Sequence, residues 1–210
     1  MHLTKSDITA TPKLKRLNLI NSISGIKPAN LIGTISGNRE TNLAIFSSVI
    51  HLGSHPALLG FVVRPDQEVR RHTYENILGN RVYTINHVSE SFIDRAHYTS
   101  ARFEKSDSEF LRCGLTEEYI VGFDAPFVKE SMIKIGLRFM EEMHIKSNDT
   151  RLIIGEIEHL IVPDEMVDTE GHINLEHKNV GISGLNSYYK LTRLAKFPYA
   201  RPNEVPDFKK

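Results

Sequence analysis

Apolar residues in this chain either alternate with polar ones or form short continuous runs, and both patterns predict β-strands. The clearest alternation covers 132–145, where Ile133, Ile135 and Leu137 are separated by small or charged residues, although a helix over 137–143 is the alternative. The other predicted strands cover 29–36, the stretch 41–64 as two strands joined at 53–56, 81–88, 151–162, 173–175 and 180–182.

Helices are predicted between these strands, over 12–25, 72–79, 89–98 and 191–195. Apolar residues in 99–124 follow no clear period, and a long segment of this kind is often a loop that carries a functional site or forms a dimer interface. Because hairpins connect most of the strands, a mainly β (α+β) antiparallel barrel with flanking short helices is favoured over a doubly wound sheet. We expect one domain over 29–202, an N-terminal arm with a short helix over 1–28, and a C-terminal tail over 203–210.

Composition and charge narrow the class of protein. Lys+Arg and Asp+Glu are 26 each, so the net charge is zero and gives no reason to expect nucleic acid or an acidic membrane as a partner. The single cysteine, Cys113, leaves no intrachain disulfide and no cysteine-based metal cluster. The N-terminus has no apolar signal-peptide core, and no run is long enough to span a bilayer. We therefore expect a cytoplasmic protein.

Motifs for catalysis by side chains are missing from the sequence. It contains no GxSxG for a nucleophile, no HExxH for zinc, and neither GxGxxG nor GxxxxGK[ST] for a nucleotide. The paired carboxylates Glu117-Glu118 and Glu141-Glu142 are weak candidates for glycoside hydrolysis. The residues therefore indicate a binding site, with no catalytic group and no metal site expected.

Two polar features are candidates for that site. Ser47 and Ser48 interrupt an otherwise apolar strand, so they either close the strand's own turn or form a ligand-binding edge. The predicted helix starting at His72-Thr73 follows Arg64, Arg70 and Arg71, and a helix N-terminus beside arginines can hold a phosphate. The alternative for this second feature is an ordinary helix cap beside solvated arginines.

Six segments, in order and spacing, resemble the flavin reductase-like, FMN-binding split-barrel proteins, and the longer flavoredoxin-like members most of all. The resemblance runs from about residue 29 to 202. The segments are TNLAIFSSV followed by HPALLGFVVRP, RHTYENI, RVYTINHV, LIIGEI and GLNSYYKLTRLAKFPYARP.

The resemblance implies a six-stranded antiparallel Greek-key split barrel and a homodimer with FMN near the interface. It implies hydride transfer from NADH or NADPH to flavin N5, which needs no acid or base from the protein. The residues that it places around the flavin are Asn30, Thr34, Asn42, Ala44, Phe46, Ser47, Ser48, Val49, Arg64, Arg71, His72, Thr73, Tyr188, Tyr189 and Arg201.

One departure from the family pattern concerns the nicotinamide cofactor. Many short members carry Gly-Asp-His before the strand that matches LIIGEI, and the histidine is associated with nicotinamide binding. This chain has Asn148-Asp149-Thr150 there, with His144 and His172 as possible substitutes. A non-catalytic FMN-binding or electron-carrier protein is therefore the alternative function. An OB-like nucleic-acid binder is disfavoured by the neutral charge and the lack of a regular aromatic series.

Overall fold

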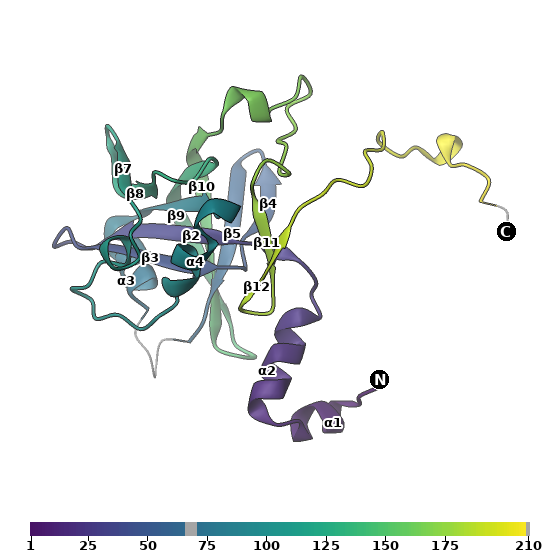
Figure 1. The fold of residues 1–210 in the computed structure, drawn as a ribbon, viewed down its shortest axis with the longest axis horizontal. Helices are drawn as coiled ribbons and strands as arrows, with labels where there is room; N and C mark the ends of the chain where they lie inside the picture. The colour runs from purple at the N-terminus through teal and green to yellow at the C-terminus, as the bar shows by residue number, and fades with distance from the viewer. Residues whose placement is uncertain (66–70, 209–210) are drawn as a thin grey trace.

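A computed structural model describes residues 1–65 and 71–208, and its centre is one antiparallel sheet (Figure 1). Seven strands form this sheet, in the order β3-β2-β6-β9-β10-β5-β4. They are β2 (Asn30–Ile35), β3 (Thr41–Phe46), β4 (Ile50–Ser54), β5 (Ala57–Val63), β6 (Val82–His87), β9 (Lys134–Ile145) and β10 (Thr150–Ile161). The protein is thus mainly β with short helices, as expected.

The strand count differs from the six expected, and the reason lies at residues 47–49. The stretch from Thr41 to the turn at 53–56 was expected to be one strand, but it breaks after Phe46 and resumes at Ile50. Its two parts, β3 and β4, occupy opposite ends of the strand order. Residues 47–49 therefore form a corner that carries the chain from one edge of the sheet to the other.

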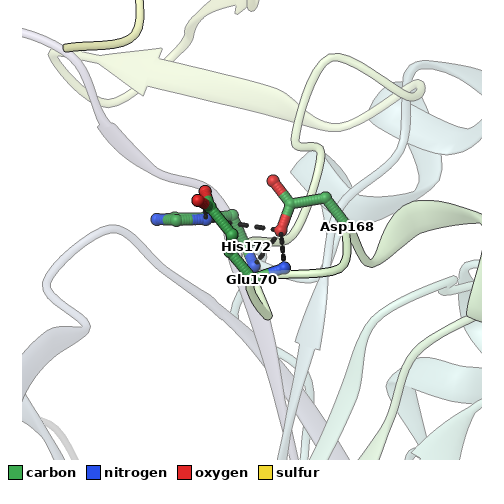
Figure 2. A group of neighbouring side chains, drawn as sticks. All are labelled: Asp168, Glu170 and His172. Carbon is green, nitrogen blue, oxygen red and sulfur yellow. Dashed lines mark hydrogen bonds and ion pairs between the residues drawn. The ribbon is translucent and has the colours of Figure 1, made fainter. Parts of the chain in front are cut away.

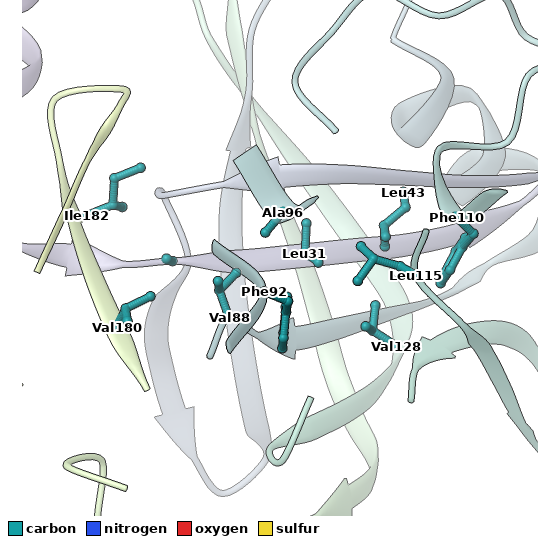
Figure 3. Close-up of a cluster of buried hydrophobic side chains, with 11 residues drawn as sticks. Leu31, Leu43, Val88, Phe92, Ala96, Phe110, Leu115, Val128, Val180 and Ile182 are labelled. Atoms are coloured by element: carbon teal, nitrogen blue, oxygen red, sulfur yellow. The ribbon is translucent and has the colours of Figure 1, made fainter. Parts of the chain in front are cut away.

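The two faces of β2 pack against different cores because side chains alternate along a strand. Leu31, opposite Ile45, belongs to a cluster with Leu43, Phe92 and Phe110 (Figure 3). Ile32, on the other face, belongs to a cluster formed mainly by residues of β5, β6, β9 and the helix α3 (His72–Asn80). All six residues of β2 are buried, so this strand is the shared wall of both cores.

Two smaller sheets complete the strands. β1 (Lys27–Pro28), β11 (Val180–Ser183) and β12 (Ser187–Lys190) form one, and β7 (Glu117–Ile120) pairs with β8 (Phe123–Val128) in the other. β8 lies so close to β2 that a Cβ at Gly33 would clash with the Pro126 carbonyl. The hairpin of β7 and β8 was not predicted; its first strand falls in the aperiodic stretch 99–124.

The helices are short and lie outside the sheet. They are α1 (Lys5–Ala10), α2 (Lys13–Ser22), α3 (His72–Asn80), α4 (Ile93–Tyr98) and α5 (Glu109–Arg112), with 3₁₀ turns η1 (Glu90–Phe92), η2 (Asp164–Met166) and η3 (Pro202–Glu204). α1, α2 and the chain after β12 extend away from the sheets (Figure 1), and the expected domain end at 202 falls in this C-terminal extension. None of the helices in the described ranges is long and apolar enough to cross a membrane.

Three predicted segments, 132–145, 173–175 and 191–195, differ in how far the structure agrees with the sequence. Residues 134–145 form a strand, not a helix. A register shift between Ile154 and Gly155 marks a β-bulge in the interior of β10. The helix predicted over 191–195 is wrong, because this segment has no regular structure and Leu194 is 97 % exposed, so no apolar face is buried. The strand predicted over 173–175 is wrong apart from one bridge at Ile173.

Candidate functional site

The edge strand β3 is half covered and half open. The Leu43 amide donates to Glu109 Oε2 at 2.9 Å, so its N–H points away from β2. Alternation in an antiparallel ladder turns the Ile45 amide the same way. Among the described residues, the amides of Ile45 and Ser47 have no hydrogen-bond acceptor. Two backbone donors, one on β3 and one in the corner, therefore have no acceptor within the described residues.

The two serines of the corner differ in their surroundings. Ser48 Oγ accepts from the Val62 amide at 3.0 Å and lies 3.3 Å from the Val62 carbonyl oxygen, so its hydroxyl ties the corner to β5. Ser47 is half-buried beside the open part of β3. The sequence left two alternatives for this serine pair, a structural role or a ligand-binding edge, and the two serines differ. Ser48 is a structural tie to a neighbouring strand, and Ser47 is the serine left at the open edge.

Asn30 lies at the end of β2 nearest the corner, between Phe46 on β3 and His87 on β6. Phe46, with Val49 beside it, packs against the core on this face. Asn30 is completely buried, yet neither atom of its amide group has a partner in the described part of the protein. Burial also lowers the pKa of His87 to about 4, so this imidazole is neutral at pH 7.

Thr34, Asn42, Thr73 and Asn76 form a buried polar network that ties α3 to β2 and β3. Asn42 Nδ2 donates to Thr73 Oγ1 at 3.0 Å and lies 3.3 Å from Thr34 Oγ1. Asn76 Nδ2 also donates to Thr34 Oγ1, at 3.1 Å. The predicted ligand residues Thr34, Asn42 and Thr73 are therefore brought together, with their side chains turned inward and held by each other.

The start of α3 retains the features expected of an anion site. The cap residue Arg71 makes no side-chain cap hydrogen bond, and Glu75 N is the first amide with an acceptor inside the helix. Arg71 Nε donates to the Pro65 carbonyl at 3.2 Å, and Arg64 is exposed. His72 is half-buried at the first helical position. Arg70, the other arginine named from the sequence, lies outside the described residues.

The predicted C-terminal residues fall into two places. Tyr188 lines a groove of about 480 Å³ between α4 and β12, where its hydroxyl lies 3.2 Å from His97 Nδ1, and burial raises its pKa to about 12. Tyr189, the next residue of β12, is exposed. Arg201 lies in the C-terminal extension and pairs with Glu204, so within one chain it is not brought to the β3 edge.

A group of possible metal ligands, Asp168, Glu170 and His172, lies elsewhere, on the exposed loop after η2 (Figure 2). Lys196 forms ion pairs with both carboxylates, so its ammonium group already balances the negative charge that a metal ion would neutralise. The pKa of Asp168 is held well below its usual range, and the largest cause is the hydrogen bond that its carboxylate accepts from the His172 amide. This cluster attaches the C-terminal extension to the body and is not a strong metal candidate.

His144 and His172, the possible substitutes for the nicotinamide-associated histidine, lie away from β3, and three other residues near β3 were not predicted from the sequence. His144 contacts Asp149 at 2.6 Å in an exposed turn, and His172 belongs to the Lys196 cluster. The overlooked residues are Glu109, Asn76 and His87. A carboxylate such as Glu109 in an aperiodic loop gives no sequence signal. His87, by contrast, occupies a strand position that alternates with Asn86 and could have been read as inward-facing.

Comparison with known proteins was made against families and solved structures. Residues 26–181 match the family model of the flavin reductase like domain. A Shewanella frigidimarina structure, provisionally named a flavin reductase with a split barrel domain, is 49 % identical with a TM-score of 0.91, covering 95 % of this chain and all of that one. The 2-nitrobenzoate 2-nitroreductase of Pseudomonas fluorescens is 20 % identical with a TM-score of 0.81, and both chains are covered completely. The flavoredoxin of Desulfovibrio vulgaris is 20 % identical with a TM-score of 0.72, covering 83 % of this chain and 92 % of that one. The chain therefore belongs to the flavin reductase like domain family.

Proposed function

We propose that this protein is an FMN-binding oxidoreductase, a flavin reductase that uses NADH or NADPH as its hydride donor. The observation that carries the proposal is the open half of β3, where the Ile45 amide faces away from β2 and the Ser47 amide just beyond the strand has no acceptor among the described residues. Two backbone donors two residues apart on this half-buried edge suit the carbonyl and nitrogen acceptors of an isoalloxazine edge.

The surrounding residues fit FMN at both of its ends. The unpartnered amide of Asn30 lies beside the open edge and offers a further donor and acceptor. At the far end of β3, Asn42 holds Thr73, which places the uncapped N-terminus of α3 next to the strand. Helix N–H groups with Arg64 and Arg71 nearby suit a phosphate. FMN, when bound, supplies the two-electron chemistry, and the protein positions it and leaves one face open.

The homodimer is part of this proposal, and the C-terminal extension supports it. Leu194, Phe197 and Tyr199 are 97, 83 and 87 % exposed, which is unusual for three large apolar side chains within six residues of one segment. A second copy would cover them and could bring Arg201 to the neighbouring site. A Phe197→Ser, Tyr199→Ser double variant should sediment as a lighter species than the parent, and an unchanged mass would remove the extension from the interface.

The alternative is a non-catalytic FMN carrier, and the lack of a histidine at Thr150 favours it. Optical spectra of the purified protein with FMN, recorded before and after NADH or NADPH under anaerobic conditions, test both functions. Bleaching of the flavin band within seconds supports the reductase. A bound flavin that neither cofactor bleaches supports the carrier, and protein that retains no flavin contradicts both.

The phosphate end can be tested separately with Arg64→Ala and Thr73→Ala. Arg64→Ala removes a hydrogen bond to the charged phosphate, and Thr73→Ala removes the bond from Asn42 that holds the N-terminus of α3 beside β3, so each should weaken FMN binding by about 1–3 kcal/mol. Riboflavin, which lacks the phosphate, should bind parent and variants alike. Because Thr73 is buried in the network with Asn42, Thr73→Ser is the matched control that keeps the hydroxyl. Equal losses for FMN and riboflavin would mean that the variants are misfolded.

A further inference from the structure

Phe46, Asn30 and His87 form one cross-strand row on the inner face of the sheet. Asn30 pairs with Phe46 across β2–β3 and with His87 across β2–β6. The His87 amide donates to the Ile133 carbonyl on the other side, so Asn30 and His87 are a non-hydrogen-bonded pair. This is the closer type of antiparallel pair, with the two side chains adjacent on the same face.

Both polar side chains of this row lack partners. Asn30 has 0 % of its surface exposed, and its amide oxygen and nitrogen make no hydrogen bond with any described residue. The His87 ring likewise has no hydrogen-bond partner within residues 1–65 and 71–208. Buried amides are almost always paired, because an unpaired donor or acceptor costs the whole desolvation penalty. The unpaired amide of Asn30, beside a partly buried imidazole with no partner in the described part of the protein, indicates a missing third group.

A comparison on the same pair of strands strengthens this argument. Asn86 is also a fully buried asparagine, one residue before His87 and on the opposite face. Its amide donates to the Leu31 carbonyl and to Thr84, and its oxygen accepts from the Val128 amide. The fold can therefore satisfy a buried asparagine completely here, and it does not do so at Asn30.

The chemistry of the row defines what the third group must be. The Asn30 amide offers a donor and an acceptor. Burial keeps the His87 imidazole neutral, so one of its ring nitrogens is a donor and the other is an acceptor. A phosphate or carboxylate would leave the acceptors unpaired, and a metal ion would leave the donors unpaired. A neutral edge that combines C=O with N–H satisfies all of them.

We propose that Asn30 and His87 together bind the amide or imide edge of a ligand at the Phe46–Val49 corner. The location rests on the proposed function, since the open half of β3 adjoins the same corner. His87 is only partly buried and so gives access from solvent. Two ligands carry this chemistry: the pyrimidinedione edge of the flavin and the carboxamide of nicotinamide.

The first experiment separates a ligand role from a structural one in the protein without ligand. Asn30→Leu removes an unpaired amide, so its melting temperature should equal or exceed that of the parent. Asn86→Leu, the matched control, removes three hydrogen bonds and should melt several degrees lower. If Asn30→Leu falls as far as Asn86→Leu, an internal partner such as an ordered water holds Asn30, and the proposal is wrong.

The second experiment identifies the source of the edge by direct binding. If the flavin supplies it, the parent should bind FMN about tenfold more tightly than N3-methyl FMN, and Asn30→Leu and His87→Leu should lose that preference. If nicotinamide supplies it, the same variants should abolish a preference for nicotinamide over 3-acetylpyridine. No preference in either pair overturns the proposal. If the parent protein binds no FMN at all, the proposed function is refuted instead. The comparison of nicotinamide with 3-acetylpyridine then still tests Asn30 and His87.

Discussion

Acidification should destabilise this protein through His87, and the size of the effect can be worked from its surroundings. Burial lowers the pKa of His87 from 6.5 to about 4 in the folded protein. Between these two values the unfolded chain binds a proton that the folded chain excludes. The unfolded state therefore holds more protons, and the free energy of unfolding falls as the pH falls. The loss begins near the unfolded pKa and levels off below the folded one.

The magnitude follows from the proton linkage of one group. Going from about pH 7.5 to about pH 4.5, His87 alone should remove about 2.5 kcal/mol from the free energy of unfolding. That is a large part of the 5–15 kcal/mol that typically stabilises a domain. Because other groups titrate over the same interval, the useful quantity is the difference between the parent and a variant without the histidine.

Urea unfolding of the parent and of His87→Leu at several pH values measures that difference. The parent should lose about 2.5 kcal/mol more than His87→Leu over the interval, whereas His51→Leu, an exposed histidine on β4, should follow the parent. Parallel pH profiles for the parent and His87→Leu would show that the imidazole is solvated in the folded state. The description of His87 as a partly buried histidine that stays neutral would then be wrong.

Two further predictions concern stability around the barrel. Gly155→Ala should cost about 1–3 kcal/mol in urea unfolding, because the added methyl group would clash with the fully buried hydroxyl end of Tyr83; an unchanged midpoint would mean that Tyr83 can move. Ser48→Ala should cost about 1–2 kcal/mol because the Val62 amide loses its acceptor, whereas Ser47→Ala should stay within about 0.5 kcal/mol. Equal costs at the two serines would contradict the tie assigned to Ser48.

Much of the sheet was predictable because its strands carry local signals. The long hairpin of β9 and β10 alternates clearly and turns at Asn148-Asp149, and Gly155 marks the bulge. The hairpin of β7 and β8 carries no such signal, since Glu117 and Glu118 lack apolar alternation and the strands pair through a shifted register. The failed helix over 191–195 had the right spacing of apolar residues, but Leu194 is almost fully exposed, so no apolar helix face is buried to stabilise it.

The site was only partly predictable, for a related reason. Residues close in sequence, such as Ser47 and Ser48 or His72 and Thr73, could be recognised as groups. Their partners come from distant segments, and pattern alone cannot pair them: Glu109 is 66 residues from Leu43, and Asn76 is 42 from Thr34. The ligand itself was suggested by the family resemblance, whereas the direction of each side chain required the structure.

The corner at residues 47–49 explains how the proposed ligand edge can remain open in this fold. An open strand edge is a risk for association, and proteins usually cover it. Here Glu109 covers β3 at Leu43, and Ser48 fixes the chain to β5 just beyond the strand end. Within the described residues, the amides of Ile45 and Ser47 between these two ties have no acceptor, and the ties restrain the chain on both sides of them. A gap of this size is too short to recruit another strand, yet it offers two fixed donors to a planar ligand, which is the geometry that binding without reorganisation requires.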